Sequence, residues 1–209
     1  VGDALGFPIR GVPPAALARL PALAEDFAPR PRGRYAKGQF SDDTQLLLAT
    51  AESAVLEKAI EGRSAAAHFA WLWKEGIILQ PPPALSEAAG RLLAGTPWMS
   101  AGAPLGVRDP SVLSRAVVVG LWDGACPSRI AHDTEVLSVI THKDPVCAAA
   151  AAAFARAVSL GLTGEPSTPE SFCREVAAVA SVADPGLGKE LRHLPRALSW
   201  EVSKALSLL

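Results

Sequence analysis

The sequence lacks an excess of charge of either sign. Its 20 lysine and arginine residues stand against 21 aspartate and glutamate residues, which gives the 209 residues a formal net charge of -1. The basic residues are also spread along the chain and do not gather in one segment. Binding to nucleic acid depends on a local concentration of positive charge that can neutralise phosphates. We therefore expect no nucleic-acid partner.

Cysteine is scarce, and long apolar runs are missing. The cysteines Cys126, Cys147 and Cys173 are odd in number and form no C-x-x-C pair, which is typical of a reduced chain and predicts a cytoplasmic protein. The longest uncharged apolar run, residues 146–155, is about half as long as a membrane-spanning helix requires. It predicts a buried helix of a soluble fold, and we expect no membrane partner.

The sequence does not begin with methionine. Its first residue is Val1, and we expect it to start inside a longer chain. Hydrophobic residues make up 49% of the chain, enough to bury a core and to exclude a disordered tail. We expect a single domain over residues 1–209 that is incomplete at both ends.

Apolar residues recur at helical spacing between glycine and proline breaks, which predicts an all-α fold. Residues 1–40 hold many of these breaks and are predicted to be mostly loop, with one short helix near residues 15–24. The valines of residues 116–121 also fit a buried strand, but an isolated strand has nothing to pair with, so helix is favoured. Residues 95–110 form a long loop. The further predicted helices cover residues 44–60, 65–75 with Ser64 as cap, 86–94, 111–122, 128–140, 144–160, 168–183 and 199–208.

Residues 40–45 read FSDDTQ and place hydroxyls and carboxylates at the start of a predicted helix. Capping alone accounts for such a segment, because serine and aspartate bind free amides and acids offset the helix dipole. The alternative is a metal site. Asp42 and Asp43 lie roughly a third of a turn apart and can flank one hard cation, with Ser41 as a third oxygen ligand. Mg²⁺ suits these ligands, and the absence of a nearby cysteine or histidine argues against zinc.

Three further segments are weaker signals on their own. Residues 1–6 (VGDALG) bracket one acid with two glycines, which is typical of a turn. Residues 109–115 (DPSVLSR) fit a capped helix start that ends in a surface arginine. Residues 141–145 (THKDP) join two helices, where His142 either packs and caps or hydrogen-bonds to a ribose or base. Serine, histidine and cysteine show no arrangement for covalent catalysis.

The order of these segments is more informative than any one of them. GDALG followed by a proline, SDDTQ with LLLATAES behind it, GTPW, LSR and THKDP resemble the ADP-ribosylglycohydrolase family, which includes the dinitrogenase reductase-activating glycohydrolases. The resemblance covers about residues 1–162. It implies an all-α fold with a two-Mg²⁺ site that cleaves the glycosidic bond between ADP-ribose and a protein side chain or small acceptor. The expected partners are therefore ADP-ribosylated proteins or small ADP-ribosyl compounds.

The same resemblance implies roles for single residues. Ser41, Asp42 and Asp43 are the expected metal ligands, the two aspartates also being the expected catalytic carboxylates. Cleavage at the anomeric carbon passes through an oxocarbenium-like transition state, and a metal pair can fix the ribose hydroxyls and lower the pKa of an attacking water. Substrate binding is expected from His142 in the ADP-ribose pocket, from Asp109, and from Arg115, whose planar guanidinium can grip the pyrophosphate.

The chain departs from the family pattern inside the region of resemblance. Arg10 stands where many members have an acid and cannot act as a general base. Pro110 stands in a turn that usually contains asparagine and glycine, and it removes an amide donor. Where some members place an acid, residues 77–83 offer only Gln80. The family's second metal motif, Asp-x-Asp-Thr, does not appear before Leu209.

These departures keep a second interpretation open. The chain holds about half of the ligands that a two-ion site uses, so we expect it to bind Mg²⁺ weakly on its own. The alternative function is a catalytically degenerate module of the same fold that binds ADP-ribose or a nucleotide.

Overall fold

The computed structural model describes residues 1–17, 27, 35–164 and 167–199. These residues form α-helices and short 3-10 helices without a β-strand, which confirms the predicted all-α fold. From the N-terminus the α-helices are α1 (Gly2–Gly6), α2 (Pro14–Leu17), α3 (Asp42–Glu57), α4 (Gly62–Lys74), α5 (Pro83–Leu93), α6 (Trp98–Ala101), α7 (Leu113–Trp122), α8 (Pro127–Val139), α9 (Pro145–Thr163), α10 (Pro169–Ala183) and α11 (Pro185–His193). The 3-10 helices are η1 (Phe7–Ile9), η2 (Pro110–Val112) and η3 (Leu194–Ser199).

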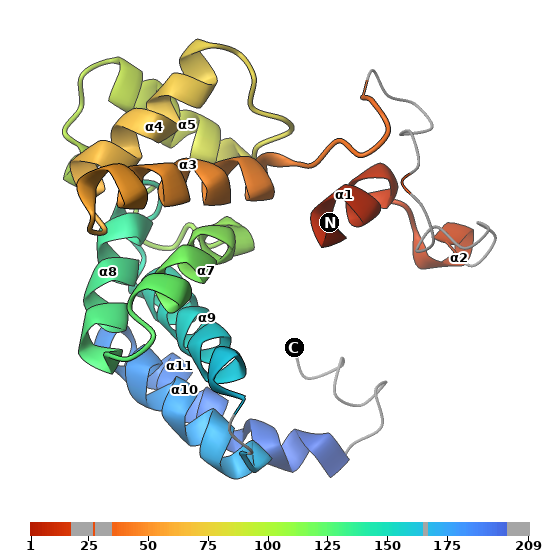
Figure 1. The fold of residues 1–209 in the computed structure, drawn as a ribbon, viewed down its shortest axis with the longest axis vertical. Helices are drawn as coiled ribbons and strands as arrows, with labels where there is room; N and C mark the ends of the chain where they lie inside the picture. Colours follow the sequence, from red (N-terminus) through yellow and green to blue (C-terminus); the bar gives the residue numbers. More distant parts are fainter. Residues whose placement is uncertain (18–26, 28–34, 165–166, 200–209) are drawn as a thin grey trace.

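The N-terminal segment is helical where the sequence predicts mainly loop. In Figure 1, α1 and α2 lie to one side of the other helices, near the start of α3. The predicted turn at residues 1–6 is wrong, because α1 closes with a hydrogen bond from the Leu5 amide to the Val1 carbonyl and continues into η1. Of the helix predicted near residues 15–24, α2 covers the first residues and the remainder lies outside the described part of the chain.

The remaining helices form two connected groups. Helix α3 packs against α4 and α7, while α9 packs against α7, α8 and α10. Predicted and observed helices agree except near their ends: α3 starts two residues early, α4 is capped by Glu61 instead of Ser64, and a short α6 interrupts the predicted long loop. The strand alternative for residues 116–121 is wrong, because they lie within α7. Helix α11 and η3 were not predicted, and residues 200–208 of the last predicted helix lie outside the described residues.

The alanine-rich helix α9 is at the centre of the core. Most of residues 146–155 are buried, as the sequence predicts. Small side chains allow close approach: a Cβ atom placed on Gly120 of α7 would lie 2.4 Å from the carbonyl oxygen of Ala155. By length and composition alone α9 could cross a membrane, a test that the core helix of a soluble protein also passes, and 44% of its apolar window is buried inside the fold.

A pair of buried carboxylates connects α7 to α8. Asp123 is the C-cap of α7, and its Oδ1 atom forms an ion pair with Nη2 of Arg129 at 2.9 Å. Asp133 of α8 is also buried, and both its burial and the neighbouring Asp123 carboxyl raise its pKa to about 7 from 3.8. The folded chain keeps a proton on Asp133 that the unfolded chain releases near pH 4. This carboxyl therefore contributes less to stability as the pH rises from about 4 to 7, and the loss is complete above pH 7.

Asp133→Asn is expected to stabilise the protein at alkaline pH. The amide carries no charge to repel Asp123 and needs no proton, so the free energy of unfolding should rise by roughly 2 kcal/mol at pH 8, or about 4–8 °C in Tm. The gain should shrink towards zero at pH 4. Urea unfolding at pH 4, 6 and 8 measures this difference, with Glu135→Gln on the exposed face of α8 as control. A gain that is equal at all three pH values would contradict the shared-proton explanation.

Candidate functional site

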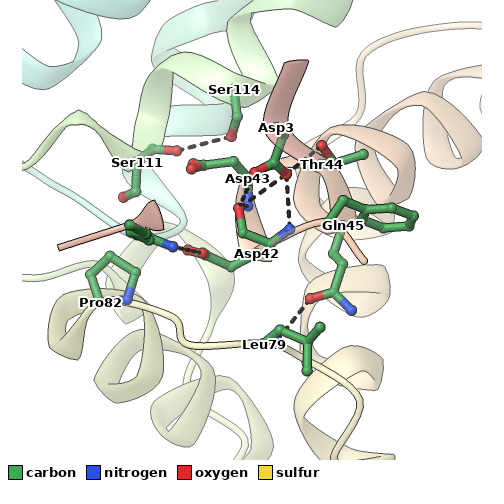
Figure 2. Close-up of polar contacts among 12 residues, drawn as sticks. Asp3, Asp42, Asp43, Thr44, Gln45, Leu79, Pro82, Ser111 and Ser114 are labelled. Atoms are coloured by element: carbon green, nitrogen blue, oxygen red, sulfur yellow. Dashed lines mark hydrogen bonds and ion pairs between the residues drawn. The ribbon is translucent and has the colours of Figure 1, made fainter. Parts of the chain in front are cut away.

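Hydrogen bonds to Asp3 of α1 hold the start of α3 in place. The carboxylate of Asp3 accepts hydrogen bonds from the Ser41 amide at 2.9 Å, from the Ser41 hydroxyl at 2.9 and 3.0 Å, and from the Thr44 hydroxyl at 2.7 Å (Figure 2). Burial raises the pKa of Asp3, but these donors outweigh burial and leave the pKa below its usual value. The GDALG and SDDT motifs are thus parts of one structure, in which Asp3 is a positioning residue.

Ser41 has the capping role that its residue type predicts. It is the N-cap of α3, and its hydroxyl oxygen accepts a hydrogen bond from the Asp43 amide at 3.3 Å. Asp42 and Asp43 occupy the first turn, where negative charge offsets the helix dipole. The capping interpretation is therefore confirmed for Ser41, and it leaves the carboxylates of both aspartates available for other partners.

Asp42 is completely buried, and only one of its two carboxylate oxygens has a partner among the described residues. Its Oδ1 atom forms an ion pair with Nη1 of Arg10 at 2.8 Å. Its Oδ2 atom is buried and has no hydrogen-bond partner among the described residues. Burial raises the pKa of Asp42, and the hydrogen bond and positive charge of Arg10 oppose that rise. A buried carboxylate oxygen without a partner is costly, so Oδ2 is open to a further donor or cation.

Asp43 lies beside a cavity of about 550 Å³. Burial, followed by the negative charge of Asp42, raises the pKa of Asp43. In Figure 2 Asp43 lies between Asp3 and Ser111 of η2, with Ser114 of α7 close by. The cavity wall also includes Asp3, Arg10, Pro82, Pro110 and Phe154. Carboxylates and hydroxyls from α1, α3 and α7 thus meet at one hollow that is large enough for part of a nucleotide-sized ligand.

Gln45 holds the loop beside the carboxylates. Its side-chain oxygen accepts a hydrogen bond from the Leu79 amide at 2.8 Å, and its side-chain amide donates to the Ile77 carbonyl at 2.7 Å. The Leu79 carbonyl in turn accepts a hydrogen bond from the Asp42 amide. Sequence reasoning missed both Gln45 and the clamp at Asp3. The order of the GDALG and SDDTQ motifs in the sequence indicated that both belong to the site. It does not show which side chains contact each other.

His142 lies in a different hollow from Asp42 and Asp43. It is buried, its Nε2 atom is 2.8 Å from Oδ2 of Asp109, and its Nδ1 atom is 3.0 Å from the Thr141 hydroxyl. Burial lowers the pKa of His142, with Asp109 opposing the shift. It lines a pocket of about 210 Å³ that includes Glu135 and Ser138, whereas the 550 Å³ cavity has other lining residues. The structure therefore does not bring His142 into one hollow with the aspartates.

Asp109 connects the two hollows. One carboxylate oxygen contacts His142, and the other accepts hydrogen bonds from the Ser111 amide at 2.9 Å and from the Ser111 hydroxyl. Burial raises the pKa of Asp109, but the donors of Ser111 and His142 outweigh it and lower the pKa overall. Pro110 and Ser111 line the larger cavity. Asp109 thus holds the turn at the cavity wall in place, and its predicted contact with substrate stays a prediction.

Arg115 is buried, so the interpretation as a surface arginine is wrong. Its guanidinium donates from Nη2 to the Thr141 hydroxyl at 2.7 Å and lies 5.2 Å from the ring centre of Phe69. Burial lowers its pKa to about 10. Nε and Nη1 have no hydrogen-bond partner within the described ranges. Position 115 falls on the face of α7 that packs into the core, and the sequence pattern did not reveal this. A contact with pyrophosphate remains a prediction.

The oxygen atoms of Ser41, Asp42 and Asp43 suit Mg²⁺ in kind, because hard cations prefer carboxylate and hydroxyl ligands. The buried and unpaired Oδ2 atom of Asp42 is the observation that supports this fit. In number the donors supply only part of a coordination shell. In the part of the chain that the structure describes, no group of three His, Cys, Asp or Glu side chains is arranged to hold a metal ion.

Comparison with known proteins decides the family. The sequence model of ADP-ribosylglycohydrolases matches residues 1–207. The chain belongs to the ADP-ribosylglycohydrolase family. The match extends well beyond residue 162, where the recognisable motifs end. An uncharacterized protein of Archaeoglobus fulgidus is 24% identical over 209 residues, in an alignment that covers all of this chain and 67% of that protein. Membership supports a hydrolase of the ADP-ribosylglycohydrolase type that acts on ADP-ribosylated substrates in general.

Proposed function

We propose that this ADP-ribosylglycohydrolase is a Mg²⁺-dependent enzyme that cleaves the glycosidic bond between ADP-ribose and a protein side chain or small acceptor. The observation that carries the proposal is that Asp43 lines the 550 Å³ cavity while its neighbour Asp42 has one buried carboxylate oxygen without a partner among the described residues. In this proposal Ser41, Asp42 and Asp43 hold Mg²⁺, which would fix ribose hydroxyls and lower the pKa of an attacking water.

The other residues of the cavity have roles that follow from their chemistry. Asp3 keeps Ser41 and Thr44 in place and thereby fixes the direction in which Asp43 points. The hydroxyls of Ser111 and Ser114 lie on the cavity wall and can hydrogen-bond to sugar hydroxyls. Positive charge develops at the anomeric carbon as the bond breaks, and a carboxylate at the cavity favours that charge. The three cysteines are unpaired, which supports the cytoplasmic location that we also propose.

The direct test measures release of ADP-ribose by the purified protein. Substrates carrying ADP-ribose on arginine, on serine and on a small acceptor are incubated with the protein in Mg²⁺ and, separately, in EDTA. We expect release from at least one substrate class in Mg²⁺ and none in EDTA. Release that persists in EDTA would exclude the metal dependence, and no release from any substrate would exclude the enzyme.

One observation favours the alternative function, a degenerate module that binds ADP-ribose or a nucleotide without cleaving it. Arg10 forms an ion pair with Asp42, so one oxygen of an expected metal ligand already has a cationic partner. Calorimetric titration with ADP-ribose separates the two functions: binding without turnover of any substrate supports the module, and turnover supports the enzyme.

A further inference from the structure

Arg10 reaches the acidic cluster, which consists of Asp3, Asp42 and Asp43, from outside α3. It ends η1, and its side chain crosses to Asp42, which lies 32 residues further along the chain. The two partners differ in exposure: the side chain of Asp42 is 0% exposed and that of Arg10 is 41% exposed. The carboxylate is thus fixed inside the fold, whereas the guanidinium lies at the cavity wall and has solvent beside it.

The charges at this place show why a cation is needed. The hydrogen bond and negative charge of Asp42 raise the pKa of Arg10, and the charges of Asp43 and Asp3 add to that rise, so all three carboxylates lie close to the guanidinium. Burying carboxylates without a counter-charge is costly. Arg10 supplies one positive charge and satisfies one oxygen of Asp42, while the other has no partner in the part of the chain that the structure describes. The guanidinium therefore compensates the cluster only in part.

We propose that Arg10 is an internal counter-ion that occupies the place of a divalent cation at Asp42 and must swing out before the metal binds. The inference rests on the proposed function, since it takes Asp42 and Asp43 as metal ligands. The ion pair holds the carboxylates in position while no metal is present. It also competes with the metal for Oδ1 of Asp42, so it lowers metal affinity and sets the concentration of cation at which the site fills.

The geometry permits this exchange. Among the described residues, Arg10 is bound to Asp42 through one nitrogen and one oxygen, and its long side chain can turn into the cavity or the solvent without moving the buried Asp42. A divalent ion brings twice the charge of the guanidinium and would be held by carboxylate oxygens, which hard cations prefer. The metal therefore replaces a weaker interaction with a stronger one, at the cost of expelling Arg10.

The test compares Mn²⁺ binding, followed by the electron paramagnetic resonance signal of the free ion, in wild type, Arg10→Gln and Arg10→Lys. We expect the Mn²⁺ dissociation constant to fall by about tenfold in Arg10→Gln and by less in Arg10→Lys, which keeps the charge. The matched control is Arg108→Gln. Arg108 is 58% exposed and pairs at 3.0 Å with Asp144, which is 3% exposed, so this variant breaks a similar ion pair elsewhere and should leave Mn²⁺ affinity unchanged.

Thermal unfolding provides a second readout and a check on folding. Without metal, Arg10→Gln should melt below wild type, because Asp42 loses its counter-ion. Mn²⁺ should raise the Tm of the variant more than that of wild type, as tighter binding to the folded state requires. Equal or weaker Mn²⁺ binding by Arg10→Gln would overturn the role of Arg10 and leave the proposed metal site standing. Binding by none of the proteins would overturn both.

Discussion

Asp43→Asn is expected to lower the rate of ADP-ribose release by about 100-fold or more, the usual effect of removing one preorganised charge from a reacting centre. Asparagine keeps the shape of the side chain and removes its negative charge. Asp43 lies beside the cavity and, unlike Asp42, has no ion pair with Arg10, so the change removes a charge that faces the substrate. Because burial and Asp42 already raise the pKa of Asp43, the neutral side chain should not lower the Tm.

Steady-state kinetics with whichever substrate class the release assay shows to be cleaved provide the measurement. The control is Glu57→Gln, which removes an exposed carboxylate at the opposite end of the same helix and should leave kcat and KM unchanged. If Asp43→Asn retained the wild-type kcat/KM while folding normally, the carboxylate would have no part in the reaction.

Gly120→Ala is expected to destabilise the protein by about 3 kcal/mol, at the upper end for overpacked cores, and to lower the Tm by about 6–12 °C. The added methyl group would lie 2.4 Å from the Ala155 carbonyl oxygen and 3.0 Å from the Val158 side chain. Backbone cannot turn aside as a flexible side chain can. Helices α7 and α9 would have to separate, and the core between them would loosen.

Gly90→Ala is the matched control for this substitution. Gly90 also lies inside a helix, but it is exposed, and a Cβ atom there meets no other atom within 4 Å. Alanine should stabilise α5 by about 0.5–1 kcal/mol, because it restricts the unfolded chain and favours helix. Thermal unfolding followed by circular dichroism measures both variants. A decrease in Tm for Gly90→Ala similar to that for Gly120→Ala would show that crowding at Ala155 is not the cause.

Helical periodicity predicted most of this fold because the long helices bury a regular apolar face. Helices α8, α9 and α10 were predicted to within about three residues at each end. Helix α1 was missed because it is short and depends on contacts that Asp3 makes with Ser41 and Thr44, far away in the sequence. Local pattern contains no information about such contacts.

The residue types of the candidate site could be predicted from the sequence, but the contacts between their side chains could not. Residue type indicated that Asp42 and Asp43 begin a helix and suit a hard cation, and the structure places both at the first turn of α3. Arg10 was noticed as a departure from the family, but its ion pair with Asp42 depends on how η1 folds back. The burial of Arg115 and the separate hollow of His142 were not predictable, because a sequence shows which residues are present and not which surroundings each one has; their roles in substrate binding stay predictions.

The attachment of Asp3 to Ser41 means that the first turn of α3 depends on two stretches of chain, 38 residues apart. Proteolysis between them would remove Asp3, which orients the turn, together with Arg10, which balances its charge. The helices from α3 onward would keep their own core contacts. Under the proposed function, cleavage after η1 is therefore expected to abolish activity while most of the fold survives.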